Sequence, residues 1–273
     1  MKKIKQYTAL SAILALVLTI LTTGCSFARQ KSAIVDYDYS EMQLIQLDAF
    51  TPESAKALAE NRPVVVITTS LGEIRLVLFP EYAPDTVAEF IAAVEEGFYD
   101  DTEVLAIKHD EDDTTDAIGA FFQAGMAKID DGFMVRTASD GTIIETPNEY
   151  SVNMWSLKGA IGAYSGDKHG VSDSRFFIVN QQPLGEERLA KMRGVVAEDG
   201  SALLPEELVE AFDEYGGVFT LSGFYTIFGQ TIEGFDVIEA ICDIEVNERT
   251  RPVEDIKIIS VKMEEIQEIE DES

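Results

Sequence analysis

Residues 172–180 read Ser172-Asp-Ser-Arg-Phe-Phe-Ile-Val-Asn180, and they have the composition of a buried β-strand around which the chain is predicted to fold. Two adjacent aromatic residues and the β-branched Ile178 and Val179 all favour extended structure. Because side chains alternate across a strand, Phe176 and Phe177 are expected on opposite faces of a sheet. One of these rings can therefore face a groove.

The composition indicates a globular and strongly acidic protein. The chain has 273 residues, of which 46% are hydrophobic, and this is enough for one large packed domain. Its 21 Lys and Arg residues against 50 Asp and Glu residues give a net charge of −29, a field that repels nucleic acids and anionic lipid headgroups. We therefore expect no nucleic-acid partner. The acidic residues are interpreted as a solvated surface, with steering of cationic peptides as the alternative.

The first 24 residues are predicted to be a bacterial lipoprotein signal peptide. Three lysines within the first five residues precede an apolar stretch over about 7–21, which is shorter than the roughly 20 residues of a membrane-spanning helix. The sequence Leu21-Thr-Thr-Gly-Cys25 then resembles the end of such a signal, although its leucine lies four rather than three residues before the cysteine. Cleavage would leave Cys25 as a lipidated, palmitate-bearing first residue. The expected location is therefore extracytoplasmic, anchored to the membrane by this lipid, with an uncleaved anchor as the alternative.

No metal or cofactor site is predicted. If Cys25 carries lipid, Cys242 is the remaining cysteine and cannot form an intrachain disulfide, and its helical apolar surroundings indicate a small buried side chain. The acidic run over 110–116 lacks the glycine and glutamate spacing of an EF-hand calcium loop, so we expect a solvated loop there.

The domain organisation follows from where strand and helix patterns begin. After the signal peptide, residues 25–62 are predicted to be a tether with one short helix over 53–60, and the folded domain spans 63–264. An extra helical insert is expected at about 183–218 and an acidic tail at 265–273.

The domain is predicted to be mainly β. A β-branched run over 64–69, the turn Leu71-Gly72 and an alternating run over 73–79 predict a hairpin, and an amphipathic helix is expected between Ala83 and Gly97. The sequence indicates about eight strands, few helices and no repeated strand-helix-strand unit. This pattern favours a closed antiparallel barrel capped by helices.

Six motifs follow one another between about 63 and 263: Thr69-Ser-Leu-Gly-Glu-Ile-Arg-Leu-Val-Leu-Phe-Pro-Glu-Tyr-Ala-Pro-Asp-Thr-Val-Ala-Glu-Phe90, Gly97-Phe-Tyr-Asp100, Phe122-Gln123, Leu157-Lys-Gly-Ala-Ile161, Ser174-Arg-Phe-Phe-Ile178 and Thr226-Ile-Phe-Gly-Gln230. In this order they resemble the cyclophilin family of peptidyl-prolyl cis-trans isomerases. The resemblance implies a closed eight-stranded antiparallel barrel capped by two helices, in agreement with the strand count. The helical insert is similar to one in some bacterial members.

The resemblance also implies a site that grips a proline ring in an apolar slot, without a metal, a cofactor or a covalent step. Motif matching places the substrate-binding residues at Phe121, Phe122, Gln123, Phe177, Leu221 and Tyr225. The phenylalanines and the leucine would form or flank the slot, the glutamine would hydrogen-bond the peptide backbone, and the tyrosine replaces a histidine of many members. For Phe177 by itself, a purely structural role in the core is the alternative.

The catalytic residue is unknown, because the position of the family's catalytic arginine is occupied by Ala106. Ala120 and Thr220 replace a phenylalanine and a tryptophan of the family pattern, so the slot is expected to be wider and less apolar. Two candidate cations remain, Lys108 on the same predicted strand and Arg175 in the place of a glutamine. For both, a solvated or ion-paired side chain is the alternative.

The leading hypothesis is an extracytoplasmic, membrane-anchored isomerase that acts on proline-containing segments of exported proteins and is monomeric. Its activity is expected to be weakened because the side chain of Ala106 carries no donor in the place of the guanidinium. The first alternative is a catalytically silent proline-peptide binder or chaperone on the same scaffold. The second is a surface interaction protein that uses only the scaffold and its acidic loops.

Overall fold

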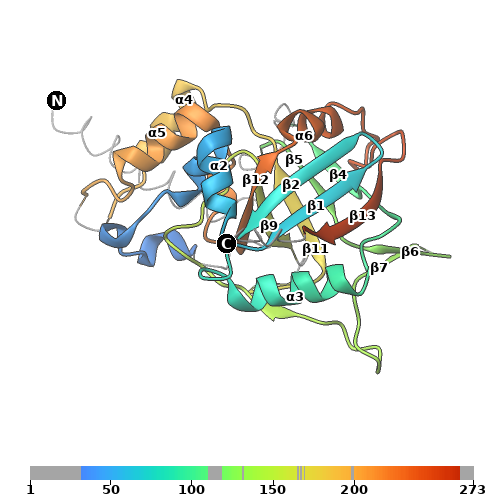
Figure 1. Cartoon of the computed structure of the whole chain (residues 1–273). Coiled ribbons are helices and arrows are strands. Elements are labelled where there is room, and N and C mark those ends of the chain that lie inside the picture. The colour runs from blue at the N-terminus through green and yellow to red at the C-terminus, as the bar shows by residue number, and fades with distance from the viewer. Residues whose placement is uncertain are drawn as a thin grey trace, which may run out of the picture. The chain divides into compact units, whose positions relative to one another are not determined.

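Figure 1 shows the computed structural model of the chain, in which a curled β-sheet is flanked by helices. The structure describes residues 32–109, 119–130, 132–164, 166, 168, 170–197 and 200–264. From Ala33 onward these residues belong to one compact unit. The predictions of a signal peptide at 1–24, a lipid on Cys25, a solvated loop at 110–116 and an acidic tail at 265–273 lie outside the described residues.

The main sheet is antiparallel throughout. Within the described residues it has nine strands in the order β3-β13-β1-β2-β12-β9-β11-β5-β4. These are β1 (Val64–Thr69), β2 (Gly72–Leu78), β3 (Thr102–Glu103), β4 (Ala106–Lys108), β5 (Phe121–Ala124), β9 (Ala160–Tyr164), β11 (Arg175–Val179), β12 (Ile227–Glu233) and β13 (Lys257–Met263). Two small sheets pair β6 (Ala127–Ile129) with β7 (Gly132–Met134) and β8 (Thr146–Pro147) with β10 (Val171–Ser172). The predicted mainly β, antiparallel class is confirmed.

The prediction of a closed eight-stranded barrel is wrong, because the described strands form one sheet of nine with two edges. β3 and β4 form the two edges of the sheet, although only Val104 and Leu105 separate them in the chain. The N–H of Val104 donates to the carbonyl of Ile256 (2.9 Å), whereas the N–H of Leu105 donates to that of Gln123 (2.7 Å). The chain thus changes partner between adjacent residues, and the sheet is a curled half-barrel of nine strands.

The predicted hairpin is confirmed by a continuous ladder from Val64 opposite Val77 to Thr69 opposite Gly72. Side chains alternate in β2 as expected, with Ile74 buried and its neighbour Glu73 exposed.

Five α-helices surround the sheet in the described part of the chain: α2 (Pro52–Ala59), α3 (Pro84–Glu95), α4 (Glu186–Arg193), α5 (Glu206–Tyr215) and α6 (Phe235–Cys242). α3 and α6 are the two capping helices, and they lie at opposite ends of the curled sheet (Figure 1). α3 begins at Pro84, and the carboxylate of Glu149 accepts hydrogen bonds from the N–H groups of Asp85 (3.1 Å) and Thr86 (2.8 Å). This remote carboxylate pairs donors that a helix leaves free at its first turn.

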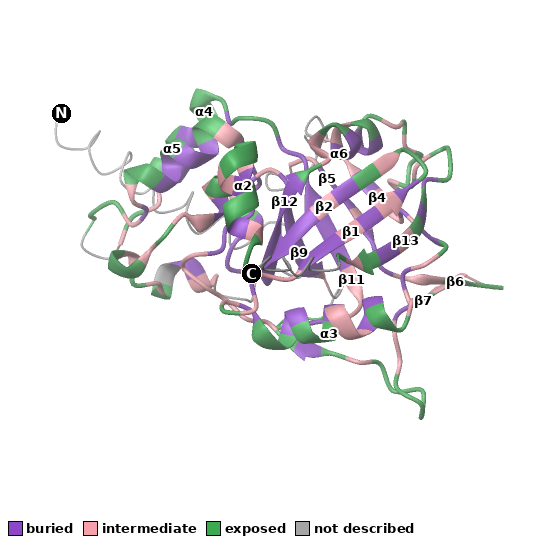
Figure 2. Ribbon diagram, viewed as in Figure 1, coloured by how far each residue is buried: buried purple, intermediate pink, exposed green. Residues whose placement is uncertain are grey.

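The sheet has two apolar faces, which we call inner and outer. The inner face forms the main core, in which Phe176 contacts Phe90 of α3 and Tyr99. The outer face carries a second cluster that includes Phe177 and Phe121. Both faces of the central strands are therefore buried, as the purple strands in Figure 2 show. The expected placement of Phe176 and Phe177 on opposite faces is confirmed.

Residues 33–62, expected to be part of a tether, are folded onto the body instead. They form the 3₁₀ turns η2 (Ala33–Asp36), η3 (Tyr39–Glu41) and η4 (Ile45–Phe50), followed by α2. Gln46 is 1% exposed, and its amide forms hydrogen bonds with both the N–H and the carbonyl of Trp155 (2.6 and 2.8 Å) and with Gln230 (2.9 Å). This arm is therefore an integral part of the fold.

The segment predicted as a helical insert contains α4 and α5. An ion pair between Arg193 and Glu206 links the two helices. The apolar faces of α4 and α5 pack on Trp155 and Leu157. A stack of rings joins the insert to the arm and to α6, because Phe50 lies between Tyr215 (4.2 Å between centroids) and Phe235 (5.6 Å). Among the described helices, none is long and apolar enough to cross a lipid bilayer.

Replacing Gln46 with Ala should lower the free energy of unfolding, because it leaves the buried N–H and carbonyl of Trp155 without partners. Each unpaired group costs about 1–3 kcal/mol. Urea unfolding measures the loss. Gln43→Ala is the matched control in the same arm, because Gln43 is exposed and should change the stability by less than about 0.5 kcal/mol. Equal stability of the two variants would contradict the role given to the arm.

Cys242 should be chemically inert in the folded protein. It is 4% exposed, and burial raises the pKa of its thiol from 9.0 to about 12, so the reactive thiolate is scarce. In a Cys25→Ser variant it is the one remaining thiol of the two in the sequence, and it should resist iodoacetamide at about pH 8 until urea is added. Rapid native alkylation, measured by mass spectrometry, would contradict this.

The contribution of Cys242 to the free energy of unfolding should fall as the pH rises from 9 toward 12, because only the unfolded thiol ionises in that range.

Candidate functional site

The candidate site lies on the outer face, where neighbouring strands bring the predicted residues into register. Ala106 of β4 pairs with Gln123 of β5, which pairs with Phe177 of β11, which pairs with Gly162 of β9. Two residues further along the strands, Lys108 pairs with Phe121. Because every second residue shares a face, these two rows form one continuous surface.

Three aromatic rings form the centre of this surface. The ring of Phe177 lies 5.7 Å from that of Phe121 and 5.5 Å from that of Tyr225, the latter at an interplanar angle of 77°. Tyr225 stacks in turn on Tyr164 at 5.4 Å. Such offset and edge-to-face contacts are favourable for aromatic pairs.

Phe177 occupies the space that a side chain at residue 162 would need. A Cβ atom added to Gly162 would lie 2.2 Å from Cζ of Phe177, closer than real Cβ atoms approach another atom. The ring is thus seated directly on the backbone of β9. A glycine inside a strand often marks such a close approach.

The slot is closed in this structure, whereas the sequence predicted a wider one. Phe177 is only 1% exposed, and Phe121, Leu221 and Tyr225 belong to the same packed cluster. A proline ring could reach Phe177 only if one of these side chains moved.

The prediction that Phe122 belongs to the substrate-binding set is wrong. Phe122 is 1% exposed and belongs to the inner core, because it alternates with Phe121 and Gln123 along β5. Its ring cannot reach the outer face. The other five predicted residues are brought together there: Phe121, Gln123, Phe177, Leu221 and Tyr225.

Two loops hold the rim of the site. Leu221 ends the short 3₁₀ turn η5 (Phe219–Leu221), and its carbonyl accepts a hydrogen bond from the N–H of Tyr225 (3.2 Å). On the opposite side, the buried amide of Gln181 accepts a hydrogen bond from the N–H of Ala120 (2.9 Å) and fixes the start of β5. Within the described residues the side chain of Gln123 forms no hydrogen bond, so its amide is available to a peptide.

The candidate cation Arg175 lies on the outer face but is neutralised. Its guanidinium donates to both carboxylate oxygens of Asp173 (2.9 and 2.7 Å), and it lies 5.3 Å from the ring of Tyr164. A Cβ atom at Gly166 would be 2.9 Å from one of its nitrogens, so the guanidinium also lies against Gly166. Arg175 thus extends the stack that supports Tyr225.

Lys108, the other candidate cation, is differently placed. It is partly buried at the edge of the sheet, beside Phe121, and it forms no ion pair with any residue that the structure describes.

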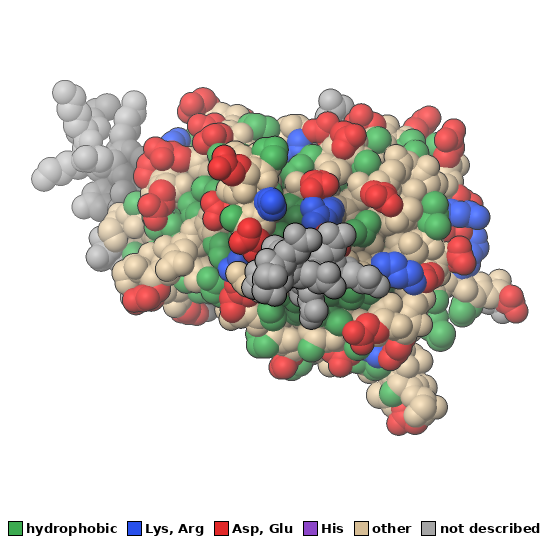
Figure 3. All heavy atoms as spheres, in the orientation of Figure 1, with side chains coloured by type: hydrophobic (Ala, Val, Ile, Leu, Met, Phe, Trp, Pro, Cys, Tyr) green, Lys and Arg blue, Asp and Glu red, His purple; other side chains and the backbone are tan. Residues whose placement is uncertain are grey.

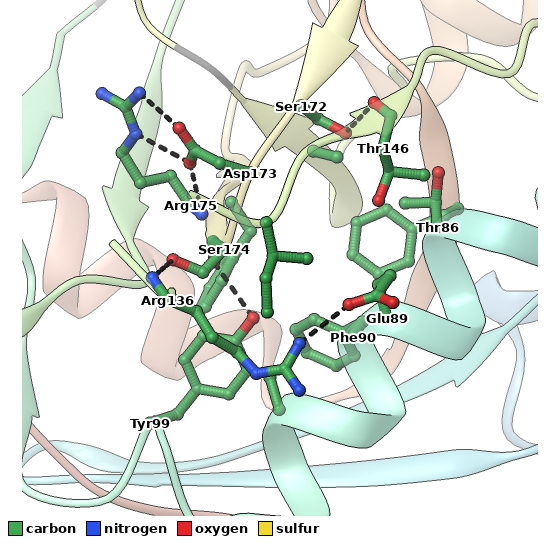
Figure 4. A pocket seen from close by; sticks show the side chains of 15 residues that line it. Thr86, Glu89, Phe90, Tyr99, Arg136, Thr146, Ser172, Asp173, Ser174 and Arg175 are labelled. Atoms are coloured by element: carbon green, nitrogen blue, oxygen red, sulfur yellow. Dashed lines mark hydrogen bonds and ion pairs between the residues drawn. The ribbon is translucent and has the colours of Figure 1, made fainter. Parts of the chain in front are cut away.

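A cavity of about 30 Å³ lies on the inner side of β11, against α3. Figure 4 shows Glu89 and Phe90 of α3 on one side and Ser172 to Arg175 on the other. Arg136 bonds Glu89 (2.8 Å) and Glu96 (2.6 Å), and it lowers the pKa of Glu96. This volume holds a water molecule or two but no proline ring.

The surface charge agrees with an acidic, solvated exterior. Figure 3 shows acidic side chains spread over the visible face, with fewer basic ones among them. In the part of the chain that the structure describes, no cluster of three or more potential ligands could hold a metal ion.

Sequence reasoning missed three residues that shape the site: Gly162, Tyr164 and Asp173. A glycine inside the apolar run over 160–163 was a usable signal, because a strand interior rarely tolerates it without reason. The stacking of Tyr164 between Arg175 and Tyr225 had no local signal, since it depends on the pairing of β9 with β11.

Comparison with known proteins gives consistent similarities. Residues 64–263 match the family described as cyclophilin type peptidyl-prolyl cis-trans isomerase/CLD. A Staphylococcus epidermidis protein, provisionally named a peptidyl-prolyl cis-trans isomerase, is 30% identical over 214 residues, which cover 78% of this chain and 98% of that protein. A Staphylococcus aureus protein with the same name is 29% identical over 215 residues, with the same coverage. The crystal structure of a cyclophilin type peptidyl-prolyl cis-trans isomerase from Cryptosporidium parvum matches with a TM-score of 0.50 and 17% sequence identity. The match covers 75% of this chain and 99% of the Cryptosporidium chain, and at this identity it supports the fold alone.

Replacing Gly162 with Ala should displace the Phe177 ring and destabilise the fold by about 1–3 kcal/mol, as overpacking of a dense core does. Urea unfolding measures the loss, and the aromatic resonances of Phe177 should shift. Gly185→Ala is the control, because an added Cβ meets nothing within 4 Å there. A Gly162→Ala variant as stable as this control would show that Phe177 is not seated on β9.

Proposed function

The chain belongs to the family of cyclophilin-type peptidyl-prolyl cis-trans isomerases, and we propose that it acts on proline-containing segments of exported proteins while a lipid on Cys25 holds it at the membrane. The reaction rotates the peptide bond before proline. The barrier to this rotation is about 18–20 kcal/mol, so the unaided rotation takes tens to hundreds of seconds. An isomerase needs no covalent chemistry, because it only has to bind the twisted bond better than the planar one.

The observation that carries the proposal is the register of Gln123 with Phe177 on the outer face. The aromatic cluster offers an apolar seat for a proline ring, and the free amide of Gln123 lies beside it to bind the peptide backbone. Binding requires that Phe121 or Tyr225 rotate away from Phe177, which is only 1% exposed. Side-chain rotations of this kind are common when a partner binds.

We propose that the activity is weak. Ala106 lies in register with Gln123 and can offer no hydrogen bond from its side chain, so this position cannot stabilise the twisted bond. Removing one such donor from a comparable site lowers the rate by about 10²–10³-fold.

The proposed location rests on the sequence of the first 25 residues. Three lysines, a short apolar stretch and Gly24 before Cys25 have the pattern of a bacterial lipoprotein signal. A chain exported in this way would meet unfolded exported proteins outside the cytoplasm, and it is proposed to act as a monomer.

A second candidate function is a proline-peptide binder or chaperone without isomerase activity. The closed state of the slot and the missing donor at residue 106 favour it, because binding and catalysis can be lost separately. Such a protein would hold proline segments without accelerating their rotation.

A prolyl-isomerisation assay tests the proposal. The chain that starts after Cys25 should accelerate a proline peptide measurably, and Ala106→Arg should raise kcat/KM by up to about 10²-fold, because it returns a donor to the row that contains Gln123. Ile259→Arg is the matched control, since it adds the same charge at an exposed site on β13. Peptide binding with no acceleration by either protein would instead support the silent binder.

A further inference from the structure

We infer that Lys108 is the cationic donor of the isomerase site, placed to hydrogen-bond the peptide amide that precedes the substrate proline. This inference rests on the proposed function and names one catalytic residue for it.

The register of β4 places Lys108 on the correct face. Ile107 is fully buried in the inner core, so its neighbours Ala106 and Lys108 must both face outward. Lys108 pairs with Phe121, a ring of the aromatic cluster. The lysine thus begins at the edge of the slot and not in the loop beyond it.

The ammonium group of Lys108 can reach the space above the slot. Lys108 and Gln123 are diagonal neighbours on paired strands, a relation in which Cα atoms lie about 7–8 Å apart and long side chains meet. A flexible four-carbon stem carries the charge. A peptide bonded to the amide of Gln123 therefore lies within range of Lys108.

Among the described strand residues of the outer face, Lys108 is also the cation that could contact a bound peptide. On the outer face, the strand residues of β4, β5, β9 and β11 that the structure describes include two cations, Lys108 and Arg175. The guanidinium of Arg175 is bound through two hydrogen bonds to Asp173 and lies against Gly166. Lys108 has no partner of this kind among the described residues, and its partial burial raises the strength of any contact it makes with a bound peptide.

A positive donor at this position favours the transition state. In the planar amide, the nitrogen lone pair is delocalised into the carbonyl group. When the bond is twisted, this lone pair is localised on nitrogen, which then accepts a hydrogen bond that the planar form cannot accept. An N–H of Lys108 aimed at the nitrogen therefore binds the twisted state more tightly, and no bond is broken and no proton is transferred.

The test compares Lys108→Met with the unchanged chain in a prolyl-isomerisation assay. Methionine keeps the unbranched shape and removes the charge, so kcat should fall by about 10²-fold while KM changes little. Lys108→Arg should recover part of the rate, since it restores a cationic donor. Lys257→Met is the matched control, because Lys257 is exposed on β13 and should leave kcat unchanged.

The outcomes separate this inference from the function on which it rests. If the unchanged chain is active and Lys108→Met is equally active, the inference about Lys108 is overturned and the isomerase function stands. A rise in KM without a fall in kcat also overturns it, because Lys108 would then only help to bind the peptide. An unchanged chain with no activity overturns the proposed function and the inference together.

Discussion

The contact between the Phe177 ring and the backbone of Gly162 is the constraint on which the outer face depends. It fixes β11 against β9 and gives Phe121 and Tyr225 a common surface to pack on. The next residue, Phe176, is equally fixed in the inner core. One short strand therefore belongs both to the core of the domain and to its candidate site. A change in core packing that moves Phe176 also moves Phe177, because the two residues are adjacent in β11.

The site combines a preserved apolar seat with an altered set of polar groups. The seat needs only buried area and shape, which the packed rings of Phe121, Phe177 and Tyr225 supply. The polar groups must satisfy a stricter condition, because a donor assists rotation only where it meets the twisted bond. Position 106 no longer meets this condition, and Asp173 holds the charge of Arg175. Binding a proline segment and accelerating its rotation are thus served by different residues of this chain.

Local patterns predicted the local structure well. The β1–β2 hairpin, α3 and the opposite faces of Phe176 and Phe177 all follow from alternation, helical spacing and turn residues. The same alternation also assigns Phe122 to the core, and the motif match obscured this. The break between β3 and β4 was not predictable, because it depends on carbonyls of Ile256 and Gln123 that are remote in sequence. The slot rings were identified through the motif order, but their closure depends on packing between β5, β9, β11 and the turn that carries Leu221 and Tyr225.

The buried amide of Gln46 has a consequence for the order in which the chain folds. Its partners Trp155 and Gln230 are 109 and 184 residues further along the chain. The arm is therefore made early during synthesis but cannot dock until β12 exists, and long-range contacts of this kind form slowly. Strand β1 pairs with β2 in a local hairpin, but its other side waits longer still, because it pairs with β13 near the end of the described chain. A protein whose proposed task is to help others fold thus has to leave its own arm undocked and one side of β1 unpaired until its last strands are made.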